Sequence, residues 1–331
     1  MIREHENTFP VPQRTFLMEN GIMANFKVTV VGAGSVGATA AQRIVEKNLA
    51  DVVLIDIVEG LPQGKALDIM ESAPVEGFSS KITGSNSYRD TTGSDVVVIT
   101  AGLARKPGMS RDDLLFKNAE IVGGIVTECA RYSPNAALLM VTNPLDVMTW
   151  LAQKKAGFPV ERVIGMAGEL DSSRYAYFIA EELGCKPSEV KATVLGGHGD
   201  QMVPVPELTR VNGKPITKLL DAATIEEINQ RTRDGGAEIV KLLKTGSAYY
   251  APSSSVVKMV RAILQDTGEV IPSCVYLKGQ YGLSDVYCGA PAELGRQGVK
   301  KIVEILLNDS ERKALHASAE DVRANFSKLK I

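Results

Sequence analysis

The chain has 331 residues, of which 44% are hydrophobic and 23% are charged, and its formal net charge is −2. This composition is typical of a globular protein that is long enough for two domains. So small a net charge provides no general attraction to nucleic acid or to an anionic membrane, and no apolar run approaches the ~20 residues of a membrane-spanning helix.

Residues 1–22 differ from the rest of the chain. They contain prolines, show no clear hydrophobic period, and carry three glutamates beside two arginines. A mitochondrial transit peptide is poor in acidic residues and a secretory signal has an apolar middle, so this segment fits neither. We expect a disordered extension, or a segment that precedes a natural start at Met23.

An apolar strand, a glycine turn and the start of a helix follow one another over residues 26–41. The turn has the G-x-G-x-x-G spacing, in which the first glycine reverses the chain, the second lets backbone approach a pyrophosphate, and the third lets the helix pack on the strand. The free N–H groups and the dipole of the helix start attract phosphates. The expected cofactor contacts in this turn are Gly32, Gly34, Ser35, Val36 and Gly37.

A second strand ends at Asp56, about twenty positions beyond the glycines, where a carboxylate accepts hydrogen bonds from an adenosine ribose. A carboxylate at this position repels a 2′-phosphate. The pattern therefore predicts a site for NAD rather than NADP.

Strands and helices continue to alternate as far as about residue 165. We expect helices near 61–72 and 114–132 and strands at 81–84, 94–102 and 136–144. The apolar runs in these strands are continuous, as in parallel strands buried on both faces. This order predicts a Rossmann-type doubly wound parallel sheet that binds its ligand at the carboxyl ends of the strands, where Gly102 and Asn143 lie.

The pattern changes beyond residue 165 and predicts an α+β domain. The expected elements are a helix over 168–184, a strand over 191–200, helices at 224–243 and 253–264, a strand pair at 270–282 and 285–295, and a closing charged helix from about Gly298.

The four cysteines are Cys129, Cys185, Cys274 and Cys288, and no two of them form a C-x-x-C pair. We expect reduced, mostly buried thiols in a reducing compartment, the cytoplasm. Isolated acidic residues lack the spacing of metal ligands, so no metal site is expected.

His198 is the best candidate for proton transfer among the three histidines, because the small residues of GGHGD leave its ring uncovered at the end of an apolar strand. Such a ring needs a carboxylate that fixes its tautomer and raises its pKa. Asp171 is the candidate, and Asp200, although nearer in sequence, is expected to be structural. Arg174 follows Asp171 by three positions on one helix, so both side chains face the same way.

The loop after the strand at 94–102 contains Arg105, Lys106 and Arg111 around a Pro-Gly turn. Three cations in seven residues are most often a solvated face. This loop leaves a strand end at the binding edge of the sheet, however, so it could also hold a small anionic substrate and move as a lid.

Seven motifs occur here in the order found in the NAD-dependent lactate/malate dehydrogenase family, which the chain resembles over about residues 24–331. They are GAGSVG, the ID at Asp56, ITAG, ARKPGMSRDDLL, VTNPLDVMT, GELDSSR and GGHGD. The resemblance implies that His198 and Asp171 are the proton-relay pair, that Arg174 clamps the substrate carboxylate, and that Arg111 polarises its carbonyl. Asn143 is implied to orient substrate and cofactor. The implied cofactor contacts also include Thr100, Ala101, Gly102, Asn118 and Val141.

Arg105 matches the family's specificity position, where arginine implies malate and oxaloacetate, and glutamine implies lactate. The second carboxylate of oxaloacetate would be buried without a partner if Arg105 were absent, and an uncompensated buried charge costs several kcal/mol. The alternatives are a lactate or other 2-hydroxy-acid dehydrogenase and, in a different class, a non-catalytic NAD-binding redox sensor. The latter would need neither His198 nor three arginines.

The resemblance also implies a closed homo-oligomer, a homodimer or homotetramer. From the change of pattern near residue 165 and from the resemblance, we expect an NAD-binding domain over 23–165 and a catalytic domain over 166–331.

Overall fold

A computed structural model describes residues 26–103 and 109–330 of the chain. The first six strands are β1 (Lys27–Val31), β2 (Asp51–Ile55), β3 (Ile82–Ser85), β4 (Val96–Ile99), β5 (Ala137–Met140) and β6 (Val163–Gly165). They are parallel and lie in the order β3-β2-β1-β4-β5-β6. The chain reverses its direction across the sheet at β1, so the predicted doubly wound parallel sheet is confirmed.

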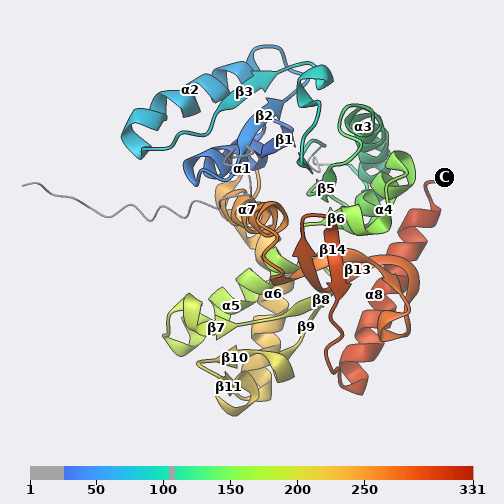
Figure 1. Cartoon of the computed structure of the whole chain (residues 1–331). Helices are drawn as coiled ribbons and strands as arrows, with labels where there is room; N and C mark the ends of the chain where they lie inside the picture. Colours follow the sequence, from blue (N-terminus) through green and yellow to red (C-terminus); the bar gives the residue numbers. More distant parts are fainter. Residues whose placement is uncertain (1–25, 104–108, 331) are drawn as a thin grey trace, which may run out of the picture.

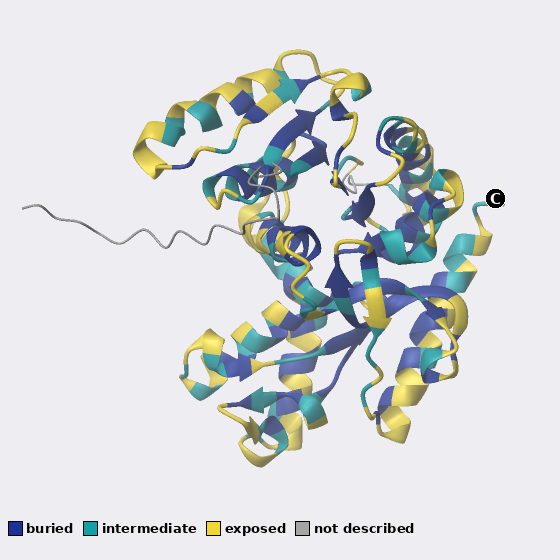
Figure 2. Ribbon diagram, viewed as in Figure 1, coloured by how far each residue is buried: buried dark blue, intermediate teal, exposed yellow. Residues whose placement is uncertain are grey.

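Helices cover both faces of these strands. They are α1 (Ser35–Glu46), α2 (Leu61–Glu76), α3 (Arg111–Tyr132) and α4 (Leu145–Ala156). Figure 1 shows α1, together with α7 from the second half, on one side of the strands, and α3 with α4 on the other. The strands are almost fully buried, and the outer faces of the helices are exposed (Figure 2). The continuous apolar runs of the sequence reflect this burial on two faces.

The second half begins at α5 (Gly168–Leu183) and extends the same sheet with antiparallel strands. Its strands are β7 (Val190–Lys191), β8 (Val194–Gly196), β9 (Met202–Pro204), β10 (Arg210–Val211), β11 (Lys214–Pro215), β12 (Val270–Lys278), β13 (Ser284–Gly295) and β14 (Gly298–Ile302). Of these, β7, β10 and β11 form a separate three-stranded antiparallel sheet. Its other helices are α6 (Ala222–Leu243), α7 (Tyr250–Leu264) and α8 (Asp309–Ser327). β12 pairs with β6 where Cys274 meets Gly165, and β13, β8 and β9 follow in order. The sheet thus continues through the expected domain boundary.

The predicted closing helix from Gly298 is wrong at its start. Residues 298–302 form β14, which pairs with β13, and the helix begins only at Asp309. Gly298 has φ +92°, which suits a hairpin turn and not a helix start. The helix start is marked instead by a capping box in which Asn308 and Glu311 bond each other's backbone N–H groups.

No helix in the described ranges is long and apolar enough to cross a membrane. The predicted extension over 1–22 lies outside the described residues.

Candidate active site

The glycine turn after β1 has the geometry that a dinucleotide needs. Gly32 has φ +104°, and a Cβ there would lie 2.7 Å from Thr100 Oγ1, while a Cβ on Gly37 would overlap the Gly32 carbonyl oxygen. Gly34 borders open space, because a Cβ at this position would have no neighbouring side chain or strand of the described residues within 4 Å. Because Gly34 also begins α1 without a capping side chain, the first N–H groups of that helix are available to phosphates.

Asp56 lies at the carboxyl end of β2, directly beside this turn. Its Oδ2 accepts a hydrogen bond from Ala33 N at 2.7 Å, and its Oδ1 accepts one from Val58 N at 3.0 Å. Each carboxylate oxygen has two lone pairs, so both can still accept a ribose hydroxyl. The carboxylate predicted for the ribose therefore also fixes the conformation of the glycine turn.

Asn118 on α3 connects two neighbouring strand ends. It is fully buried, its Oδ1 accepts from Leu103 N at 2.8 Å, and its Nδ2 donates to the Leu103 and Asn143 carbonyls at 3.2 and 2.6 Å. With both donors occupied, Asn118 is suited to hold the backbone around Gly102 and Asn143 in place. Its predicted direct contact with the cofactor stays a prediction, as do those of Thr100, Ala101 and Val141 at the same edge.

His198, in the loop after β8, contacts Asp171 on α5. His198 Nδ1 lies 2.9 Å from Asp171 Oδ2, and the two side chains are 16% and 3% exposed. Burial disfavours the charged imidazole, but the charge of Asp171 and its hydrogen bond outweigh burial and raise the pKa of His198 above its usual value. The pair that sequence reasoning selected is thus in contact, and this contact uses Nδ1 and not Nε2 of the His198 ring.

Arg174 lies one turn after Asp171 on α5 and is a largely buried cation with a weak partner. Its guanidinium is 12% exposed and 3.8 Å from Asp171 Oδ1, and its Nε has no hydrogen-bond partner among the described residues. Burial lowers the pKa of Arg174, against the charge of Asp171. A planar guanidinium whose N–H groups lack hydrogen-bond partners within the described ranges is well suited to bind a carboxylate by donating two parallel hydrogen bonds.

Two glycines that sequence reasoning missed face Arg174, and the first of them leaves it room. Gly235 and Gly236 lie within α6, where glycine costs helix stability relative to alanine. A Cβ on Gly235 would lie 3.3 Å from Arg174 Cδ, closer than an ordinary contact. A glycine pair inside an otherwise helical pattern was the available signal.

The loop of His198 is also held by two side chains that were not predicted. Asp146 Oδ2 on α4 accepts from His198 N at 2.8 Å, and Ser318 Oγ on α8 accepts from Gly197 N at 2.7 Å. Asp146 lies in the VTNPLDVMT motif, but nothing in the spacing indicates that its partner is a backbone amide 52 residues later.

Arg111 begins α3 and extends toward the same loop. Its guanidinium is 79% exposed and forms an ion pair with Asp200 at 2.8 Å. Asp200 thus has a partner other than His198, and its structural role stays a prediction. Arg105, Lys106 and the Pro-Gly turn of the predicted lid lie outside the described residues.

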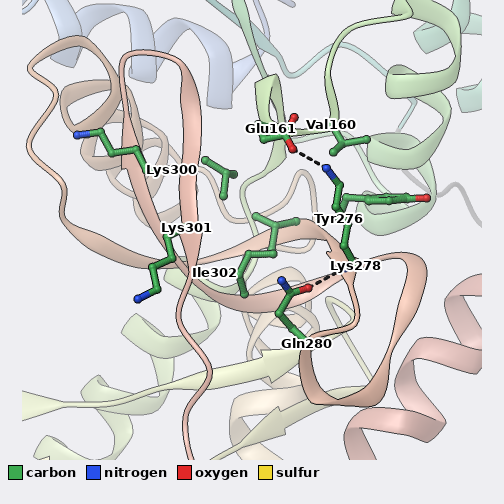
Figure 3. A pocket seen from close by; sticks show the side chains of 10 residues that line it. Val160, Glu161, Tyr276, Lys278, Gln280, Lys300, Lys301 and Ile302 are labelled. Atoms are coloured by element: carbon green, nitrogen blue, oxygen red, sulfur yellow. Dashed lines mark hydrogen bonds and ion pairs between the residues drawn. The ribbon is translucent and has the colours of Figure 1, made fainter.

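A cavity of about 350 Å³ lies elsewhere, between the short 3₁₀ helix η2 (Val160–Arg162) and strands β12 and β14. Figure 3 shows that the side chains of Glu161 and Lys278 point toward one another there, 2.6 Å apart. None of the ten residues that line this cavity is a predicted site residue, so we do not connect it with the reaction.

All four cysteines are free, and three of them are buried. In the part of the chain that the structure describes, no group of three or more His, Cys, Asp or Glu side chains is placed to hold a metal ion.

Comparison with known proteins identifies relatives over nearly the whole chain. A family model described as lactate/malate dehydrogenase, NAD binding domain, matches residues 26–165, and one for the alpha/beta C-terminal domain of the same family matches 168–330. A protein of Synechocystis sp. named malate dehydrogenase is 58% identical over 302 residues, which are 91% of this chain and 93% of that protein.

Similar solved structures come from malate and lactate dehydrogenases. Malate dehydrogenase from Salinibacter ruber has a TM-score of 0.89 and 48% identity, and the match covers 92% of this chain and 98% of that one. A lactate dehydrogenase from Cryptosporidium parvum, complexed with lactic acid and nicotinamide adenine dinucleotide, has a TM-score of 0.90 and 42% identity, with 93% and 99% covered.

Proposed function

The chain belongs to the lactate/malate dehydrogenase family, and we propose that within it the protein is an NAD-dependent malate dehydrogenase that interconverts (S)-malate and oxaloacetate. The observation that carries the chemistry is the contact of His198 with Asp171, one turn before the buried cation of Arg174. A proton donor and a carboxylate clamp at one site are what a 2-keto acid requires.

The glycine turn and Asp56 would hold the cofactor, and when bound, NAD+ would accept the hydride and NADH would donate it. Arg174 holds the carboxylate beside the reacting carbon, because its Nε has no hydrogen-bond partner among the described residues and its Nη1 lies 3.8 Å from Asp171 Oδ1. Arg111 leaves Asp200 and polarises the carbonyl oxygen.

His198 moves the proton. Its Nδ1 is engaged by Asp171, so the proton is given to, or taken from, the substrate oxygen at Nε2. Asp171 stabilises the imidazolium form of His198, from which oxaloacetate reduction starts. After the ring has given its proton to the substrate, it regains a proton from solvent before the next turnover. Exclusion of water on closure strengthens these charge interactions.

We assign specificity for a dicarboxylic acid to Arg105, on the argument from its sequence position. Its charge matches the second carboxylate of oxaloacetate, and pyruvate would leave that charge without a partner. The favoured alternative is a lactate dehydrogenase, since lactate dehydrogenases occur among the similar structures.

The test is NADH oxidation with oxaloacetate and with pyruvate. We expect oxaloacetate to be strongly preferred, and Arg105→Gln to lower its kcat/KM by about two to three decades while it improves pyruvate turnover. Equal activity of the parent with both substrates would refute the assignment of specificity. No activity with either substrate would favour a non-catalytic NAD-binding protein.

We also propose a cytoplasmic homodimer or homotetramer that acts in the tricarboxylic acid cycle. The four free thiols suit a reducing compartment. Exposed apolar side chains on α2, Leu67 at 62% and Val75 at 85%, suit a subunit interface. Light scattering of the purified protein measures the subunit number.

A further inference from the structure

We propose that Asp146 is a positioning residue for His198, which it holds by accepting the backbone N–H of that residue at Oδ2. The proposal rests on the proposed function, because it assigns Asp146 a part in the same proton transfer. Asp146 touches neither the ring nor, on the assignments above, the substrate.

The geometry around Asp146 makes this contact specific. Asp146 is 5% exposed, in the first turn of α4, and its Oδ2 lies 2.8 Å from His198 N. His198 follows two glycines and precedes a third, so its backbone has little side-chain packing of its own to fix it. A hydrogen bond to the amide of His198 itself therefore restrains the Cα from which the imidazole reaches Asp171.

The other oxygen of Asp146 is unusual. Oδ1 is buried and has no well-aligned hydrogen-bond partner within the described residues, and the thiol of Cys274, a weak donor, is the other group that interacts with this carboxyl. A carboxylate kept for packing alone would leave this polar atom unexplained, because buried polar groups are nearly always paired. An acceptor that must reach one particular amide from α4 accounts for a side-chain oxygen at this position.

The neighbours of Asp146 favour its neutral form. The titratable groups that face the site are Asp171 and Arg174 on α5, and the thiols of Cys274 on β12 and Cys288 on β13. Burial raises the pKa of Asp146 by more than the hydrogen bonds from the His198 amide and the Cys274 thiol and the charge of His198 lower it, and the charge of Asp171 adds to the rise. A neutral acid still offers its carbonyl oxygen to the amide, so the positioning role does not need the charge.

Three variants test the proposal. Asp146→Asn keeps an acceptor oxygen and removes the acid, Asp146→Ala removes the acceptor, and Ser318→Ala is the matched control, since it removes the hydrogen bond to the neighbouring amide of Gly197. We expect Asp146→Ala to lower kcat at least about tenfold, with the KM for oxaloacetate and the Kd for NADH nearly unchanged. Asp146→Asn should stay near the parent, and Ser318→Ala should lower stability without lowering kcat to this extent.

A second readout does not depend on turnover. The ring of His198 can be titrated by NMR, and its signal can be assigned against His198→Ala, because the chain has only three histidines. If the ring loses Asp171 in Asp146→Ala, its pKa falls. In Asp146→Asn, which keeps Asp171 in contact and removes only the lesser contribution of the Asp146 charge, the pKa should fall less, and in Ser318→Ala it should stay unchanged.

A fall of kcat or of the ring pKa in Asp146→Asn as large as in Asp146→Ala overturns the proposal, since the charge would then be responsible, and so does full activity of Asp146→Ala. If Asp146→Ala does not fold, Asp146→Ser, which is too short to reach the amide, replaces it. Failure of the parent enzyme to reduce oxaloacetate would instead contradict the proposed function, while the NMR titration would still test the contact.

Discussion

At the scale of single residues, the site depends on opposing effects on one imidazole. Burial lowers the pKa of His198, while Asp171, by charge and hydrogen bond, raises it by more. The net result is an imidazolium that persists to higher pH than a free histidine. Reduction of the keto acid needs this protonated ring, so its rate should fall as pH rises through the raised pKa, and malate oxidation should rise over the same range.

Asp171→Asn tests this balance. Without the carboxylate charge, burial dominates and the pKa of His198 falls, so the decline in oxaloacetate reduction should move to lower pH. We expect kcat to drop by about two to four decades, with NADH affinity nearly intact, in stopped-flow and fluorescence titrations. Glu161→Gln, the same change at the distant ion pair in Figure 3, is the control and should leave both unchanged. Near-full turnover of Asp171→Asn would show that the relay assignment is wrong.

The residues that sequence could identify are those whose side chains act on one another. His198 and Asp171 belong to separate motifs, and a histidine that titrates near neutral pH calls for a carboxylate. Asp146 and Ser318 act on backbone amides, and every residue except proline has one, so no pattern of residue types indicates those partners.

At the scale of elements, patterning predicted the interior of the molecule better than its turns. The parallel strands were recognised because burial on both faces makes them continuously apolar. The segment 298–302 was mistaken for a helix because its charged residues resemble those of α8. The hairpin turn at Gly298 and the capping box at Asn308 are local signals that override such a composition.

The contact between α5 and α6 leads to a prediction with an internal control. Gly235→Ala and Gly236→Ala both replace glycine inside α6 and should each gain up to about 1 kcal/mol of helix stability. Only the Gly235 Cβ would press on Arg174, at 3.3 Å from Cδ, whereas the Gly236 Cβ would make an ordinary contact at 3.8 Å. We expect Gly235→Ala to raise the KM for oxaloacetate by about tenfold, because the clamp is displaced. Steady-state kinetics of the two variants measures this difference in KM, and equal KM values would contradict this role of Gly235.

At the scale of the whole molecule, the two halves are less separate than their sequence patterns. The sheet runs on from β6 to β12, and α8 lies beside α4 of the first half as well as β8 and β13 of the second. The predicted division at 165 follows a change from alternating helices and strands to a mixed pattern. That change says nothing of whether strands from the two patterns pair, because the pairing of β6 and β12 joins residues more than a hundred positions apart.

The attachment of α8 to the first half can be tested through the single tryptophan of the chain. Trp150 on α4 stacks on Phe326 of α8, with ring centroids 3.9 Å apart and planes within 5°. Loss of this pair and of its apolar contact should cost about 2–3 kcal/mol of the free energy of unfolding. Phe326→Ala should therefore lower the urea midpoint, measured at one protein concentration because the protein is expected to be an oligomer, and shift tryptophan emission to longer wavelength. Lys328→Ala removes an ion pair between Lys328, the residue that directly follows α8, and Asp112 on α3. The two side chains are 41% and 54% exposed, and such exposed pairs contribute about 0–1 kcal/mol. If Lys328→Ala were the more destabilising of the two, charge and not aromatic stacking would hold α8 against the first half.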